Sequence, residues 1–181
     1  KLTFKGDKVL IEKGDKWDDN AVIWVDDNCN LDFANAKTTI TGYGAIGLST
    51  GEGASISSNE LLISNISTDD WHQGLELNSK SQFVGNGKVT INIENGKNVI
   101  GIYSDGASMT FNNDLIIKNT GNTSTESNIG INLIDNTRNS KKILSNKNID
   151  IDLQGGKDGT GFDSTHTNDI KVDGHLKINV N

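Results

Sequence analysis

The stretch from Val99 to Gly121, VIGIYSDGASMTFNNDLIIKNTG, decides the fold class. It contains three short apolar runs, which are separated by turn residues such as Asp105-Gly106 and Asn112-Asn113. Each run is too short for a helix, and Gly and Asn tolerate the positive φ angles that tight turns need. The stretch therefore predicts three strands joined by turns, and the rest of the chain repeats this unit with variations.

One recurring isoleucine aligns the last strand of the unit along the whole chain. It occurs as Ile11, Ile40, Ile63, Ile91, Ile117, Ile151 and Ile178, at spacings of 29, 23, 28, 26, 34 and 27 residues. Two positions before each isoleucine stands an apolar residue or a threonine: Val9, Thr38, Leu61, Val89, Leu115, Ile149 and Leu176. This alternation is typical of a strand with one buried face.

The first strand of the unit is expected at 21–25, 45–49, 73–77, 100–104, 129–133 and 160–164. In five of these six segments a glycine stands just before an apolar residue, as Gly47, Gly74, Gly101, Gly130 and Gly161. A recurring glycine in a strand indicates a bend or a close backbone approach. Turn asparagines also recur, and they predict hydrogen-bonded ladders between repeats, at Asn35, Asn59, Asn86, Asn112 and Asn146.

Together these repeats predict an all-β protein, a single-stranded parallel β-helix solenoid of about six coils with three short strands each. Stacked coils bury isoleucine on isoleucine and leave polar residues outside. An antiparallel sandwich is the alternative, but its strands would not recur in a fixed order. Six coils at the ~4.8 Å strand spacing give a rod roughly 30 Å long. We expect residues 1–181 to form one β-helix domain, a fragment of a longer solenoid because it begins in mid-repeat.

Composition and charge exclude several classes of function. Hydrophobic residues make up 33% of the chain, which a thin solenoid core explains without invoking disorder. The net charge of −7 argues against nucleic acid as a partner, because phosphate binding needs a basic surface. No apolar run approaches the ~20 residues of a membrane span, so we expect no direct membrane insertion by this segment. Cys29 is the single cysteine and is predicted to be buried beside Leu31 and Phe33.

The chain resembles the passenger domains of bacterial autotransporters, the type V secreted surface proteins. The resemblance lies in the Gly-apolar-x-apolar strand (GIYS, GINL, GLEL), the Asn/Gly-rich turn and the I-x-I strand that follow one another along nearly the whole chain. It implies a right-handed β-helix that is exported across the outer membrane to the bacterial cell surface. It also implies an adhesive role toward a host or bacterial partner, a surface protein or a glycan.

Candidate binding residues lie where the I-x-I strand of one coil connects to the glycine strand of the next. These connections vary most in length, and loops on a rigid scaffold commonly carry binding sites. Two of them place a tryptophan among polar residues, and an exposed tryptophan is a common binding anchor. The candidate residues are Trp17, Asp18 and Asp19 in one connection and Asp70, Trp71 and His72 in another. The alternative is that each tryptophan folds back and caps its own loop.

We expect no catalytic residues, no cofactor and no metal. The acidic loops lack the residue spacing of a calcium loop, so a solvated acidic face is the favoured interpretation. A polysaccharide-active β-helix enzyme, a lyase or a hydrolase, is the main alternative, and a glycoside hydrolase would need two carboxyl groups across a groove. Asp105, Asp135 and Asp163 follow the glycine strand at drifting offsets, which suggests turn residues instead. A purely structural stalk is the third possibility.

Overall fold

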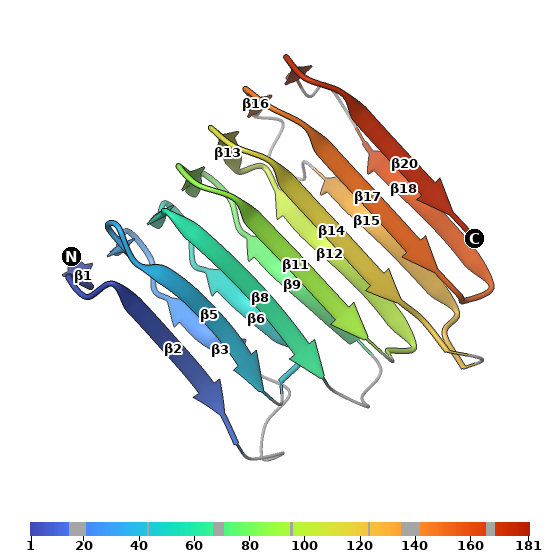
Figure 1. Cartoon of the computed structure of the whole chain (residues 1–181), viewed down its shortest axis with the longest axis horizontal. Coiled ribbons are helices and arrows are strands. Elements are labelled where there is room, and N and C mark those ends of the chain that lie inside the picture. The colour runs from blue at the N-terminus through green and yellow to red at the C-terminus, as the bar shows by residue number, and fades with distance from the viewer. Residues whose placement is uncertain are drawn as a thin grey trace.

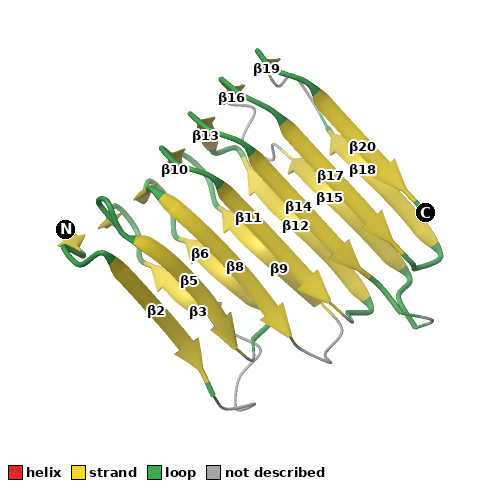
Figure 2. Cartoon of the chain, viewed as in Figure 1, coloured by secondary structure: helices red, strands yellow, loops and turns green. Residues whose placement is uncertain are grey.

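The computed structural model describes residues 1–14, 21–42, 44–66, 71–94, 96–122, 124–134, 142–165 and 169–181. These residues form strands and turns without any helix (Figure 2). Among them there is accordingly no helix of the length and hydrophobicity that a membrane span requires. The all-β prediction is confirmed.

Three parallel sheets run along the length of the molecule (Figure 1). Sheet A consists of β1 (Leu2–Thr3), β4 (Asn30–Asp32), β7 (Ser55–Ser58), β10 (Gln82–Gly85), β13 (Ser108–Phe111), β16 (Lys142–Ser145) and β19 (Asp169–Val172). Sheet B consists of β2 (Lys8–Lys13), β5 (Lys37–Gly42), β8 (Glu60–Ile66), β11 (Val89–Glu94), β14 (Leu115–Thr120), β17 (Ile149–Gln154) and β20 (Leu176–Val180). Sheet C consists of β3 (Ala21–Val25), β6 (Ile46–Thr50), β9 (Trp71–Leu77), β12 (Asn98–Asp105), β15 (Ser127–Ile134) and β18 (Asp158–Ser164).

Each coil contributes one strand to sheet C, then one to sheet A, then one to sheet B. The stretch that decided the fold is the coil made of β12, β13 and β14. Every strand pairs in parallel with the equivalent strands of the coils before and after it. Six such coils follow β1 and β2, so the parallel β-helix with three strands per coil is confirmed.

The recurring isoleucines form one continuous column inside sheet B. Each of the seven pairs in register with the next, from Ile11 to Ile178. The five inner members, from Ile40 to Ile151, are at most 1% exposed. Burying a side chain of this size contributes roughly 1.5–3 kcal/mol, so the column is a main source of stability.

The recurring glycines form a second column in sheet C, directly across the core from the isoleucines. A Cβ atom added to any of them would lie only 2.2–2.5 Å from the Cγ2 atom of an isoleucine: Gly47 against Ile63, Gly74 against Ile91, Gly101 against Ile117, Gly130 against Ile151 and Gly161 against Ile178. The predicted close approach is confirmed. The glycines are there because the isoleucine side chains occupy the space that a Cβ would need.

The asparagine ladder is present in part, at the turns from sheet A to sheet B. The Nδ2 of Asn112 donates to the Oδ1 of Asn86 at 3.0 Å, and the Nδ2 of Asn146 donates to the Oδ1 of Asn112 at 2.7 Å. Asn59 instead donates to the backbone oxygen of Asn35 at 3.1 Å. The side-chain ladder therefore links three successive coils, and a side-chain-to-backbone bond links two others.

The prediction for Cys29 is wrong, because this residue is exposed. Cys29 lies in the turn between β3 and β4, where its N–H donates to the oxygen of Asp26 at 3.0 Å. The inward positions begin only afterwards, with Leu31 and Phe33. Cys29 is close in sequence to buried residues, but the alternation of inward and outward side chains holds only within a strand. Because Cys29 lies in a turn, that alternation does not apply to it.

Candidate binding surface

Exposed large apolar side chains mark the surfaces on which a partner could bind. Five of them, Leu2, Ile170, Leu176, Ile178 and Val180, are in register with buried residues of the neighbouring coil and are exposed because they belong to the first or last strand of their sheet. The remaining four lie on outer faces: Leu10 and Leu62 on sheet B, and Trp24 and Trp71 on sheet C, with Leu10 and Trp24 on the first strand of their sheets. Trp24 is 57% exposed and Trp71 is 56% exposed. Tryptophan is the residue most enriched in binding hot spots, so sheet C is the first candidate.

The local sequence of β9, WHQGLEL, explains how Trp71 comes to face solvent. Successive side chains of a strand point to opposite faces, so Trp71 points out and His72 points in. His72 is fully buried and pairs in register with Val99 of the core. The expectation that His72 lies in an exposed loop is therefore wrong, because β9 begins two residues before the predicted strand.

The other sequence candidates divide into two groups. Trp71 is at the surface as expected, although it lies in a strand and not in a loop. It stands at the edge where the strands of sheet B end and those of sheet C begin, and these strand ends line up along one side of the molecule (Figure 1). Trp17, Asp18, Asp19 and Asp70 lie outside the described residues.

Trp24 begins a row of outward side chains that runs along the rod axis, which we name the Trp24 row. Its members pair in register from strand to strand: Trp24, Ser49, Glu76, Tyr103, Asn132 and Asp163. At the ~4.8 Å spacing of parallel strands, Trp24 and Tyr103 stand roughly 14 Å apart, three strands from each other. Ser49 donates to the carboxylate of Glu76 at 2.5 Å and is itself buried, so it forms the floor between Trp24 and Glu76.

Electrostatics in the Trp24 row are dominated by carboxylates. The pKa of the Tyr103 hydroxyl is raised, first because the residue is partly buried and then because Asp105 and Glu76 are close. Burial disfavours the charged phenolate, and the neighbouring carboxylates act in the same direction. The row therefore combines an exposed indole, a phenol and acidic side chains.

A second row lies closer to the edge and begins at Trp71. Its members are Trp71, Asn98, Ser127 and Asp158, again in register across neighbouring strands. Between the two rows run Ala21, Ile46, Gln73, Ile100, Ile129 and Thr160. We name the two rows and this middle row together the sheet C face. Its two tryptophans are exposed, whereas Ile100 is only 2% exposed.

The three sheets differ in the charges on their strands. Sheet A carries Lys142 and Lys171 against Asp32 and Asp169, and sheet B carries five lysines against five carboxylates: Lys8, Lys13, Lys37, Lys118 and Lys177 against Glu12, Glu60, Glu94, Asp150 and Asp152. The strands of sheet C carry Glu76, Asp105, Asp158 and Asp163 and not one lysine or arginine. Positive and negative residues are equal in number on the strands of sheets A and B, whereas those of sheet C carry negative residues alone.

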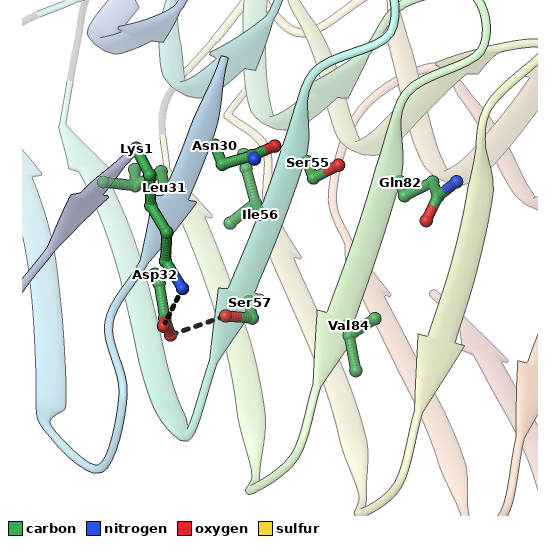
Figure 3. Close-up of a pocket in the computed structure, with 9 residues that line it drawn as sticks. All are labelled: Lys1, Asn30, Leu31, Asp32, Ser55, Ile56, Ser57, Gln82 and Val84. Carbon is green, nitrogen blue, oxygen red and sulfur yellow. Dashed lines mark hydrogen bonds and ion pairs between the residues drawn. The ribbon is translucent and has the colours of Figure 1, made fainter. Parts of the chain in front are cut away.

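Sheet A contains a smaller polar hollow of about 250 Å³, shown in Figure 3. Its central group is the carboxylate of Asp32, which accepts hydrogen bonds from Ser57 Oγ at 2.7 Å and from the N–H of Ala34 at 2.9 Å. The Nζ of Lys1 lies 3.3 Å from the other carboxylate oxygen. These partners, Ser57 foremost, lower the pKa of Asp32. The carboxylate is thus already satisfied within the chain, which makes this hollow a weaker candidate than the sheet C face.

The structure also places two of the three aspartates that follow the glycine strand, Asp105 and Asp163. Asp163 is in register with Asn132, whereas Asp105 is in register with Ile134, so the two do not share a row. Asp135 lies outside the described residues. Within the described part of the chain, no three His, Cys, Asp or Glu residues are grouped closely enough to hold a metal ion.

Comparison with known proteins returned no matching family model, no matching curated protein and no matching solved structure. The function must therefore be argued from the surface itself.

Sequence reasoning missed the Trp24 row, although a signal for it was present. Its members from coil to coil stand two positions after the recurring glycines, as Ser49, Glu76, Tyr103, Asn132 and Asp163. In the first coil Val22 takes the place of the glycine, and Trp24 stands two positions after it. The row was missed because its members share no residue type, and only their common distance from the glycine marks them.

Proposed function

We propose that this chain is a segment of a bacterial surface adhesin of the autotransporter type. A rigid β-solenoid presents the sheet C face and the neighbouring connections to a partner on a host or bacterial cell, without catalysis. The observation that carries the proposal is the exposure of Trp24 and Trp71 on one face of a regular rod. Export across the outer membrane and a location at the cell surface are part of the same proposal and follow from the sequence resemblance.

The physical support is the contrast between the rigid interior and the varied outer face. The isoleucine column continues through every coil and the glycine column through five of the six, so the scaffold holds its outer side chains in fixed positions. Preorganised side chains bind with a smaller entropy cost than flexible ones. Several weak contacts spread along such a face add to one specific interaction.

The test is binding of the purified chain to whole host and bacterial cells and to a glycan array. The variant Trp24→Ala/Trp71→Ala removes both exposed indoles from sheet C, and Leu10→Ala/Leu62→Ala removes two exposed aliphatic side chains from sheet B. We expect the tryptophan variant to lose at least about tenfold in affinity, as for a binding hot spot, and the leucine variant to bind normally. Equal losses in the two variants would contradict the proposal. Absence of binding by the unaltered chain would favour the structural stalk.

A further inference from the structure

Three of the four carboxylates on the strands of sheet C, those of Glu76, Asp158 and Asp163, form no ion pair with a lysine or arginine of the described residues. On sheet B, by contrast, Lys37 lies 3.1 Å from Glu60, and on sheet A, Lys1 lies 3.3 Å from Asp32. The negative charge of the three sheet C side chains is therefore available to a partner.

The aromatic side chains share the same face. Trp24, Trp71 and Tyr103 are all the tryptophans and tyrosines among the described residues, and all three project outward from sheet C. Indole and phenol rings attract cations through their faces, by roughly 0.5–1 kcal/mol at an exposed site. Carboxylates and aromatic rings on one face favour the same type of group, an ammonium or a guanidinium.

The spacing of the Trp24 row suits an extended polypeptide. Trp24 and Tyr103 are three strands apart along the rod, which is roughly 14 Å. Alternate side chains on one side of an extended chain are spaced by about 7 Å, so two cationic residues four positions apart in a basic segment can reach both rings. Arginine fits both features, because its guanidinium pairs with a carboxylate and stacks on an aromatic ring.

We propose that the sheet C face binds a basic, extended segment of a partner protein, whose arginine and lysine side chains pair with Glu76, Asp158 and Asp163 and stack on Trp24 and Tyr103. This inference rests on the proposed function, since it names the chemistry of the partner that the same face recognises.

The experiment measures binding of fluorescent nona-arginine to the full 181-residue chain at about 150 mM salt, by fluorescence anisotropy. The test variant is Glu76→Gln/Asp158→Asn/Asp163→Asn on sheet C. The matched control is Glu12→Gln/Glu94→Gln/Asp152→Asn, which removes three carboxylates from the strands of sheet B. The control and the test variant therefore have the same net charge. A second test variant is Trp24→Ala, compared with Leu62→Ala.

We expect the sheet C triple variant to weaken binding by roughly tenfold, as three ion pairs of modest strength would. The sheet B triple variant should change the affinity for nona-arginine by less than about twofold. Trp24→Ala should lower this affinity by roughly threefold. Far-UV circular dichroism checks that all variants are folded.

Two outcomes would overturn the inference. Equal weakening by the sheet B and sheet C variants would mean that the peptide senses only the net charge of the chain. Binding of an amino-sugar oligomer in preference to the peptide, with the same dependence on sheet C, would mean that the partner is a cationic glycan. Because the peptide assay needs no cells, its result is separate from the cell-binding test of the proposed function.

Discussion

Sheets B and C face each other across the same core, yet their outer faces differ in charge and in aromatic content. Inside, they are complementary, because each glycine of sheet C leaves room for an isoleucine of sheet B. Outside, sheet B mixes lysines with carboxylates, whereas the charged residues on the strands of sheet C are all carboxylates and share the face with exposed aromatic rings. The comparison teaches that in this solenoid the inner columns specify the fold, and that the outer rows are free to specify recognition.

The strongest test of the inner half of this comparison is Ile117→Ala. Ile117 is fully buried in the middle of its column, so truncation should leave a cavity and lower the free energy of unfolding by about 3–4 kcal/mol. Ile116→Ala is the matched control, because Ile116 points outward from the same strand, and its cost should stay below about 1 kcal/mol. Urea denaturation measures both values, and similar losses would contradict the division into inner and outer columns.

The opposite change, the filling of space, should cost slightly less. In Gly101→Ala the new Cβ would lie 2.5 Å from Ile117 Cγ2 and 2.6 Å from the backbone oxygen of Gly130. We expect a loss of about 2–3 kcal/mol, because the next coil has to shift. Gly6→Ala is the control, since its Cβ would meet nothing closer than 3.6 Å. Equal unfolding midpoints for the two variants would show that the close approach is not needed.

A smaller effect is expected from the asparagine ladder, which stands between the inner and outer parts. Asn112→Ala removes two side-chain hydrogen bonds, one to Asn86 and one to Asn146. Because the ladder is exposed, the loss should be about 1 kcal/mol, measured by thermal denaturation. Asn59→Ala removes a single bond to a backbone oxygen and should cost about half as much. A loss of stability as large as that expected for Ile117→Ala would show that the ladder stabilises the fold as much as the core does.

The smallest effect should come from the outer face of sheet A, at Asp32. Its hydrogen bonds with Ser57 and Ala34 lower its pKa in the folded state, so they stabilise the fold above the ordinary pKa of 3.8. At neutral pH Asp32→Asn should therefore cost about 0.5 kcal/mol, a value kept small by solvent screening. The difference should disappear as the pH falls through the lowered pKa. Urea denaturation across this pH range measures the free energy of unfolding of both proteins. A difference between them that grows on acidification would contradict a lowered pKa for Asp32.

The fold could be predicted from the sequence because each coil repeats the same physical solution. The regular recurrence of Ile63, Ile91 and Ile117 predicts the buried isoleucine column of sheet B. The recurring glycines predict the close approach of sheet C to these side chains. The surface was harder to predict, because outer positions are not constrained by packing. His72 was misplaced because nothing in its sequence marks where β9 begins. Trp24 was not among the candidate residues, because the short apolar strand AVIWV does not by itself show which of its side chains point outward; its register with Ser49 does.

The central claim is that the sheet C face, and not another side of the rod, contacts the partner. Site-directed blocking tests it most directly, in a Cys29→Ser background that removes the exposed native thiol. One new cysteine replaces Asn132 on sheet C, and another replaces Thr90, an outward position of sheet B. Each is coupled to a bulky maleimide, and binding of the labelled proteins to cells is measured beside the unlabelled ones.

We predict that labelling at position 132 abolishes binding and that labelling at position 90 leaves it unchanged. Loss of binding only from the label on sheet B, or equal binding by both labelled proteins, would contradict the claim.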